Sequence, residues 1–161
     1  MTMTQGPFSK GASGSGELAI ISGGLVTLHF LVLGNLTLVD LILEKGKTML
    51  SGGSLHVGGG FTPYARVHLL RSIIRLCEST STGGAVYADG AGGSAVILLT
   101  NSTLESNKGL HGGGLFASRG AKVELTEGSK SSLKNNQATI YGGGILLQME
   151  GTHLDISGVG T

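Results

Sequence analysis

The chain has 161 residues, including 30 glycines and only 2 prolines, and its formal net charge at pH 7 is +1. Hydrophobic residues make up 40% and charged residues 13% of the chain, which is the reverse of the balance found in disordered proteins. The low proline content excludes collagen, the near-neutral charge argues against a nucleic-acid partner, and the single cysteine, Cys77, excludes a disulfide framework and a cysteine-based zinc site.

The length fits one domain. We predict that residues 1–17 form a flexible Gly/Ser-rich N-terminal segment and that residues 18–161 form one parallel β-helix repeat domain. The first residues lack the charged start and apolar run of a secretory signal. The most apolar stretch, 18–43, is interrupted by Gly, His, Asn and Asp, so we expect no transmembrane segment.

Glycine pairs recur along the repeat domain at intervals of 29 to 31 residues, and each opens a short run of apolar or small residues. We interpret the pairs as the corners of a repeating coil, where the chain needs a positive φ or where a side chain would collide with the next coil. The members of the five pairs are Gly23, Gly24, Gly52, Gly53, Gly83, Gly84, Gly113, Gly114, Gly143 and Gly144.

Two ladders of apolar residues run between the glycine pairs. The first has the form apolar-x-apolar and occupies 36–38, 67–69, 96–98, 123–125 and 154–156. We predict that its apolar members, Val96 and Leu98 among them, point inward, and that His68 and its equivalents point to water. The second ladder ends on leucine in each unit, at Leu43, Leu76, Leu104 and Leu133.

Each unit of roughly 30 residues therefore offers three short strands separated by turn residues. Stacking of equivalent strands predicts an all-β fold, a right-handed single-stranded parallel β-helix (solenoid) with about five coils of ~30 residues. Residues 64–77 also place apolar side chains at helical spacing. Their register with the other units and their β-branched residues favour strands over a helix.

Residues 83–147 carry GGAV, LESN, GGGL, LKNN and GGGI in succession. This series resembles the GGA(I/V)…FxxN repeat of chlamydial polymorphic outer-membrane proteins and related right-handed β-helix adhesin passengers of the pectin-lyase-like fold. Leu104 and Leu133 stand where that repeat has phenylalanine, and Asn107 and Asn136 match its asparagine. The resemblance implies an adhesin-like role at the cell surface or outside the cell.

The acidic residues are scattered along the sequence, and the histidines occupy different phases of the repeat. A polysaccharide lyase of this fold needs clustered carboxylates for calcium and a basic proton acceptor, and a hydrolase needs two facing carboxylates. We therefore expect no catalytic residue, no metal site and no cofactor.

Two groups of polar residues are candidate sites. Arg66, His68, Arg71 and Arg75 form a local excess of positive charge, which is either an anion-binding patch or the solvated face of one coil. Asn107 and Asn136 lie at successive turns and predict a ladder of side-chain amides that satisfies buried turn backbone.

These observations favour a non-enzymatic surface or interaction module that binds protein or glycan, such as a host or cell-surface molecule, along a flat face. The alternative is a fragment or relative of a pectate-lyase-like carbohydrate-active protein, and a truncated reading frame is a third interpretation. The terminal coils show no capping motif, which predicts self-association through uncapped ends.

Overall fold

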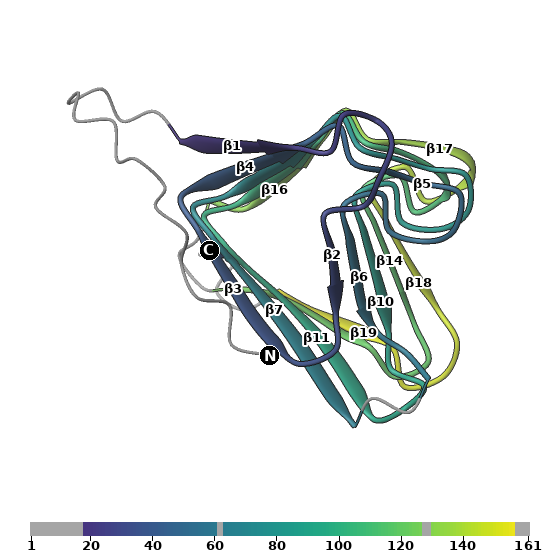
Figure 1. The fold of residues 1–161 in the computed structure, drawn as a ribbon. Coiled ribbons are helices and arrows are strands. Elements are labelled where there is room, and N and C mark those ends of the chain that lie inside the picture. Colours follow the sequence, from purple (N-terminus) through teal and green to yellow (C-terminus); the bar gives the residue numbers. More distant parts are fainter. Residues whose placement is uncertain (1–17, 61–62, 127–129, 157–161) are drawn as a thin grey trace.

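The computed structural model describes residues 18–60, 63–126 and 130–156, and within them every regular element is a β-strand. The strands stack in parallel into a β-solenoid of about four turns, which Figure 1 shows in a view down the solenoid axis. The described residues contain no helix of the length and apolarity that a membrane crossing requires. The predicted flexible segment 1–17 lies outside the described residues.

Four parallel sheets form the walls of the solenoid, and we name them in the order in which one coil visits them after its glycine corner. Sheet B contains β2 (Phe30–Val32), β6 (Leu55–Gly58), β10 (Val86–Asp89), β14 (Leu115–Ser118) and β18 (Ile145–Gln148). Sheet C contains β3 (Asn35–Val39), β7 (Tyr64–Leu70), β11 (Ser94–Thr100), β15 (Lys122–Leu125) and β19 (His153–Ile156).

The other two walls complete each coil. Sheet A contains β1 (Ala19–Ser22), β4 (Leu41–Glu44), β8 (Ile73–Arg75), β12 (Thr103–Glu105) and β16 (Ser132–Lys134). Sheet D contains β5 (Lys47–Thr48), β9 (Glu78–Ser79), β13 (Lys108–His111) and β17 (Gln137–Tyr141).

The chain runs through sheets B, C, A and D in turn, so a coil has four strands rather than the predicted three. The sequence does not predict sheet D because its strands are short and polar, as in Lys47–Thr48 and Glu78–Ser79. Strands β2 to β17 make four complete coils. The fifth predicted coil is represented by β18 and β19, and β1 adds one further strand to sheet A.

The segment 64–77, where a helix was the alternative, forms β7 and β8. Strand β7 alternates between buried and more exposed side chains along its length, and it pairs in parallel with β3 and β11. The strand prediction for this segment is therefore confirmed.

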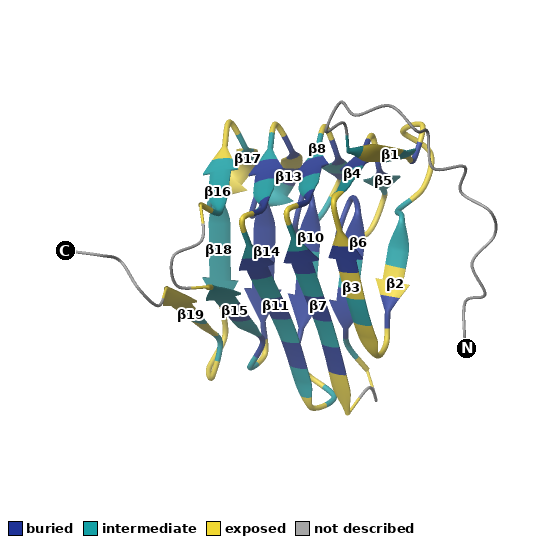
Figure 2. Ribbon diagram, turned by 90° about the vertical axis from the view of Figure 1, so that its left-hand side faces the viewer, coloured by how far each residue is buried: buried dark blue, intermediate teal, exposed yellow. Residues whose placement is uncertain are grey.

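The core fills the space between the four sheets and consists almost entirely of aliphatic side chains. Figure 2 shows the buried positions alternating along the long strands of the central coils. In β11 the inward residues are Ile97 and Leu99, which pair with Val67 and Leu69, so the predicted inward pair Val96 and Leu98 is wrong by one residue. Every residue from 95 to 99 is apolar, so alternation alone did not reveal which side faces the core.

The second ladder lies in sheet A and also differs from the prediction at one coil. Leu43, Ile74, Leu104 and Leu133 are register partners, and the first three are buried. The predicted member Leu76 lies two residues later, outside β8, with 44% of its surface exposed. The ladder position in that coil is occupied by an isoleucine, Ile74, so a pattern of leucines points to the wrong residue.

Most of the glycine pairs lie at the corner between sheets D and B. Gly52 has φ +77°, and a Cβ on Gly53 would overlap the Gly84 carbonyl oxygen of the next coil. Backbone hydrogen bonds show that the equivalent residues are Gly83 with Gly84, Gly112 with Gly113, and Gly142 with Gly143.

The predicted pairs in the last two coils are therefore displaced by one residue. Gly114 and Gly144 take the position of Ser54 and Ala85. The pair Gly23 and Gly24 occupies a different corner, because the Gly23 amide donates to the Glu44 carbonyl at the end of β4. A run of three glycines in the last two coils left the alignment ambiguous in the sequence.

Candidate functional site

Most carboxylates near the middle of the solenoid are engaged by a basic side chain of the neighbouring coil. Asp40 pairs with Arg71, Glu44 with Arg75, and Asp89 with Arg119. Burial opposes ionisation of Asp89, but hydrogen bonds from Arg119 and the Ala91 amide outweigh it and lower its pKa. The described residues hold no group of three His, Cys, Asp or Glu side chains that could bind a metal ion.

The predicted anion-binding patch is divided between two walls and an intervening turn. Arg66 and His68 lie on β7 in sheet C, Arg75 lies on β8 in sheet A, and Arg71 lies in the turn between them. Arg71 donates two hydrogen bonds of 2.7 Å to the Asp40 carboxylate, and this pairing lowers the pKa of Asp40. Two of the three arginines are therefore neutralised by the coil before them, so the four residues do not form one anion site.

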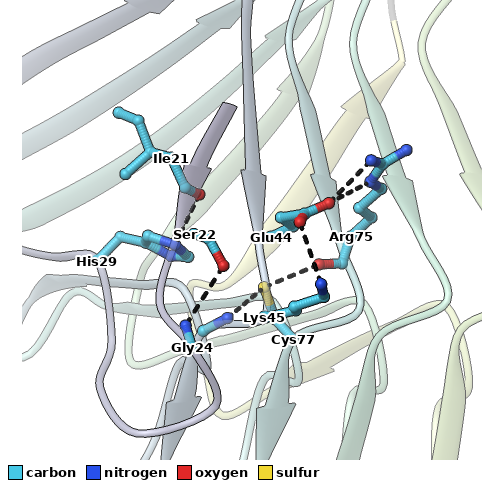
Figure 3. Close-up of polar contacts among 9 residues, drawn as sticks. Ile21, Ser22, Gly24, His29, Glu44, Lys45, Arg75 and Cys77 are labelled. Atoms are coloured by element: carbon cyan, nitrogen blue, oxygen red, sulfur yellow. Dashed lines mark hydrogen bonds and ion pairs between the residues drawn. The ribbon is translucent and has the colours of Figure 1, made fainter. Parts of the chain in front are cut away.

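Arg75 makes the second of these contacts, at the end of sheet A. Figure 3 shows the Glu44 carboxylate between Arg75 and Lys45. Arg75 Nη2 lies 2.8 Å and Lys45 Nζ lies 3.5 Å from the nearer carboxylate oxygen. The hydrogen bonds from Arg75 lower the pKa of Glu44. Because Glu44 and Arg75 belong to successive coils, the cluster connects these coils.

The outer side of sheet C is the broadest regular surface of the solenoid. Its longest strands, β7 and β11, have seven residues each and run side by side with β3 in Figure 1. At about 3.3 Å per residue and about 4.8 Å between strands, five strands make a face of roughly 20 by 20 Å. Its two central rows are Asn35, Arg66, Val96, Lys122 and His153, and Thr37, His68, Leu98, Glu124 and Asp155.

This sheet C face combines charged, hydroxyl and aliphatic groups. Lys122 Nζ lies 2.8 Å from Glu124 and 3.8 Å from Asp155. His68 Nε2 lies 3.0 Å from Thr100 Oγ1. Burial, together with the charge of Arg66, lowers the pKa of His68.

The asparagine pair lies at the turn between sheets A and D, and its side chains are stacked. Asn107 Nδ2 donates to Asn136 Oδ1 at 3.0 Å and to the Ile74 carbonyl at 3.1 Å. Asn107 Oδ1 accepts from the Cys77 amide at 3.0 Å. Asn107 is 1% exposed, and its amide therefore satisfies buried backbone groups of the coil before it.

Cys77 and Gly46 continue this column toward the N-terminus. The Gly46 amide donates to Cys77 Sγ at 3.4 Å, a weaker bond than the amide provides in the later coils. Burial raises the pKa of the Cys77 thiol to about 11. Cys77 is thus a structural member of the column and is unsuited to act as a nucleophile.

The residue before each member of this column has a left-handed backbone. Its φ is +55° at Lys45, Leu76 and Ser106, and +52° at Asn135. Asparagine is enriched in this conformation, whereas other residues that carry a Cβ, leucine among them, pay about 1–2 kcal/mol. Leu25, in the loop between β1 and β2, also has a positive φ, of +61°.

Both strained leucines line one groove at this turn. The groove has a volume of about 430 Å³ and is lined by Leu25, Lys45, Leu76, Glu78, Ser106, Asn107, Lys108, Asn135 and Gln137. A second groove, of about 230 Å³, shares Glu78 and Lys108 with the first. Lys47 lies in the second groove, with its Nζ 2.9 Å from Glu78.

This double groove was not predicted from the sequence. The leucine pattern of the sequence predicts a core position for Leu76, and neither Leu25 nor Lys108 is among the predicted site residues. One signal was present in the sequence: the turn motif of the later coils, LESN and LKNN, becomes IRLC at residues 74–77, with leucine where the later coils have serine and asparagine.

The fold and these surfaces define the chain as a parallel β-solenoid with an aliphatic core and ion-paired outer walls. No protein-family model, no curated protein and no solved structure matches it.

Proposed function

We propose that the protein is a non-enzymatic binding module that recognises another macromolecule with the outer face of sheet C. The observation that carries this proposal is the sheet C face itself, which is held in register by long parallel strands. A surface of this kind needs little ordering on binding. The turn motifs that resemble polymorphic outer-membrane protein repeats support the same interpretation, with an adhesin-like setting.

The composition of the face favours a protein partner over a glycan. Val96 and Leu98 provide an aliphatic centre, and Arg66 and Lys122 flank it. Arginine is enriched at the energetically important positions of protein interfaces. The aromatic ring on β7, Tyr64, lies at the edge of the face, whereas glycan sites commonly offer ring faces to the sugar.

The size of the face sets the expected affinity. A stable protein interface covers about 800 Å² on each partner. Five strands offer roughly 400 Å² in projection, so these coils alone support weak, reversible binding. More coils with the same register would extend the face in proportion.

The test is a binding screen of the chain against purified cell-surface and matrix proteins and against a glycan array. The double variant Arg66→Thr/Leu98→Thr keeps residues that favour β-strands but removes the charge and the aliphatic centre. We expect it to bind at least about tenfold more weakly than the wild type, a difference of about 1.4 kcal/mol. Ile73→Thr, on the outer side of sheet A, is the matched control and should bind normally.

Two outcomes would overturn the proposal. The first is equal binding by the wild type and the double variant. The second is calcium-dependent release of unsaturated products from polygalacturonate, which would support the alternative, a pectate-lyase-like carbohydrate-active protein.

A further inference from the structure

We infer that the double groove at the turn between sheets A and D is a second binding site, and that it takes an extended acidic peptide segment carrying large apolar side chains. The groove lies on a different wall from the sheet C face, so it is independent of the function proposed above. It extends past all four complete coils, from Lys45 to Gln137.

Two exposed leucine side chains line the groove. Leu25 and Leu76 are 43% and 44% exposed, and both line the larger groove. Both also have a left-handed backbone, at φ +61° and +55°. Neither burial nor backbone preference explains a leucine at either position. Residues held in sparsely populated backbone conformations cluster at ligand-binding and other functional sites.

The lining of the two grooves carries more basic than acidic side chains. Lys45, Lys47 and Lys108 line the two grooves, and Glu78 is the acidic residue among their lining groups. Lys45 and Lys47 contact Glu44 and Glu78, respectively. Within the described residues, no carboxylate lies within ion-pair distance of Lys108, which is exposed on β13. Lys108 is thus available to a carboxylate of a bound peptide.

The shape of the site favours a peptide over a compact ligand. The lining of the larger groove comes from the same turn of all four complete coils, so the groove follows the solenoid axis from coil to coil. Polar side chains at Ser106, Asn135 and Gln137 continue it beyond the leucines and can form hydrogen bonds with peptide backbone. An extended segment can then place apolar side chains at Leu25 and Leu76 and a carboxylate at Lys108.

The test uses fluorescein-labelled peptides in which Leu and Glu alternate, matched with peptides in which Lys replaces Glu. Fluorescence anisotropy with the full chain should show saturable binding of the acidic series and at least about tenfold weaker binding of the basic series. Equal binding of both series, or no saturable binding of the acidic series, would overturn the inference.

Variants at Leu76 separate binding from folding. Leu76→Asn places a residue that tolerates the left-handed conformation at this position, so we expect the melting temperature to rise by about 2–4 °C. Binding of the acidic peptides should weaken about tenfold at the same time. A purely structural leucine would not show this opposite movement. Met49→Asn, at an exposed residue outside the lining of both grooves, is the control for loss of an apolar side chain.

A matched pair of lysine variants tests whether the charge of Lys108 contributes to binding. Lys108→Gln should weaken binding of the acidic peptides and reduce its dependence on salt. Lys134→Gln removes an exposed lysine on β16, outside the lining of both grooves, and should leave binding unchanged. Equal effects of the two substitutions would contradict a specific role for Lys108.

Discussion

The turn between sheets A and D is built in two ways within one molecule. In the last two coils it reads ESNK and KNNQ, with Ser106 and Asn135 at the left-handed position and asparagine next. In the first two coils it reads EKGK and RLCE, and Gly46 and Cys77 replace the asparagines. The backbone path is the same in all four coils, but only the fourth has, in Asn135, a residue type that the left-handed conformation favours. The comparison teaches that the stacked coils tolerate different residues at this turn. It also shows that the strained groove residue, Leu76, belongs to the second coil.

We expect the largest loss of stability when the side-chain amide of Asn107 is removed. Asn107→Leu leaves the Cys77 amide and the Ile74 carbonyl without the bonds that Asn107 now makes. Each buried unsatisfied group costs about 1–3 kcal/mol, so we expect a loss of about 3–5 kcal/mol in unfolding free energy. Urea denaturation followed by circular dichroism measures this. A loss below about 1 kcal/mol would show that the column does not hold the coils together.

The first coil has no room for a side chain at Gly46, which occupies the same position in the column. A Cβ on Gly46 would overlap the Gly53 carbonyl oxygen and lie 2.8 Å from His29 Nδ1. We expect Gly46→Ala to cost about 2–3 kcal/mol through overpacking. Gly144→Ala is the control, because a Cβ there meets nothing within 4 Å, and it should change stability by less than about 0.5 kcal/mol.

We expect the second coil to become more stable when Cys77 is replaced by the asparagine that the later coils have at this position. In Cys77→Asn, the new amide can accept from the Gly46 amide and donate to the Leu43 carbonyl, as Asn107 does one coil later. Replacing the weak sulfur contact should add about 1 kcal/mol to the unfolding free energy. Thermal unfolding of this variant beside Cys77→Ser tests the point, and a Cys77→Asn protein no more stable than Cys77→Ser would contradict it.

The smallest expected effect is a pH dependence in the first coil. His29 Nδ1 lies 2.9 Å from Ser54 Oγ, and its Nε2 lies 3.1 Å from the Ile21 carbonyl. Burial lowers the pKa of His29 below its usual value of 6.5, although the backbone contacts oppose this shift. The unfolded chain therefore binds the proton more readily, so stability is complete above about pH 6.5 and falls as the pH drops toward the lowered folded pKa.

We expect His29→Gln to reduce this loss between pH 7 and 5 by under about 1 kcal/mol, because one pKa unit corresponds to about 1.4 kcal/mol. His56 and His68 also have lowered pKa values, caused mainly by burial, and supply the remaining dependence. An unchanged pH profile in His29→Gln would show that this histidine does not contribute.

The sequence was sufficient to predict the solenoid because its period is marked by glycine and asparagine, which few other residues can replace at these positions. Glycine at a crowded corner recurs every 29 to 31 residues, and Asn107 and Asn136 lie 29 residues apart at successive turns. Register within a strand was harder to predict. Residues 95–99 are apolar on both sides of β11, so the choice of Ile97 over Val96 for the core depends on pairing with Val67.

The candidate sites were less predictable for a related reason. Arg71 and Arg75 are close in sequence, but their roles are set by Asp40 and Glu44, each 31 residues earlier. Leu76 resembles a core residue until the turn places its backbone in the left-handed region. Such contacts arise between coils, and a single unit of sequence does not contain them.

In-register stacking of the coils is tested most directly by cross-linking two outward positions that face each other. Thr103 Oγ1 and Ser132 Oγ lie 3.0 Å apart on neighbouring strands of sheet A. Thr103→Cys/Ser132→Cys should form a disulfide on mild oxidation, because register partners are close enough for one, while the buried Cys77 thiol stays reduced. Thr103→Cys/Lys134→Cys, displaced by one step along β16, should not. Mass spectrometry of the oxidised variants would contradict the stacking if the second pair cross-links and the first does not.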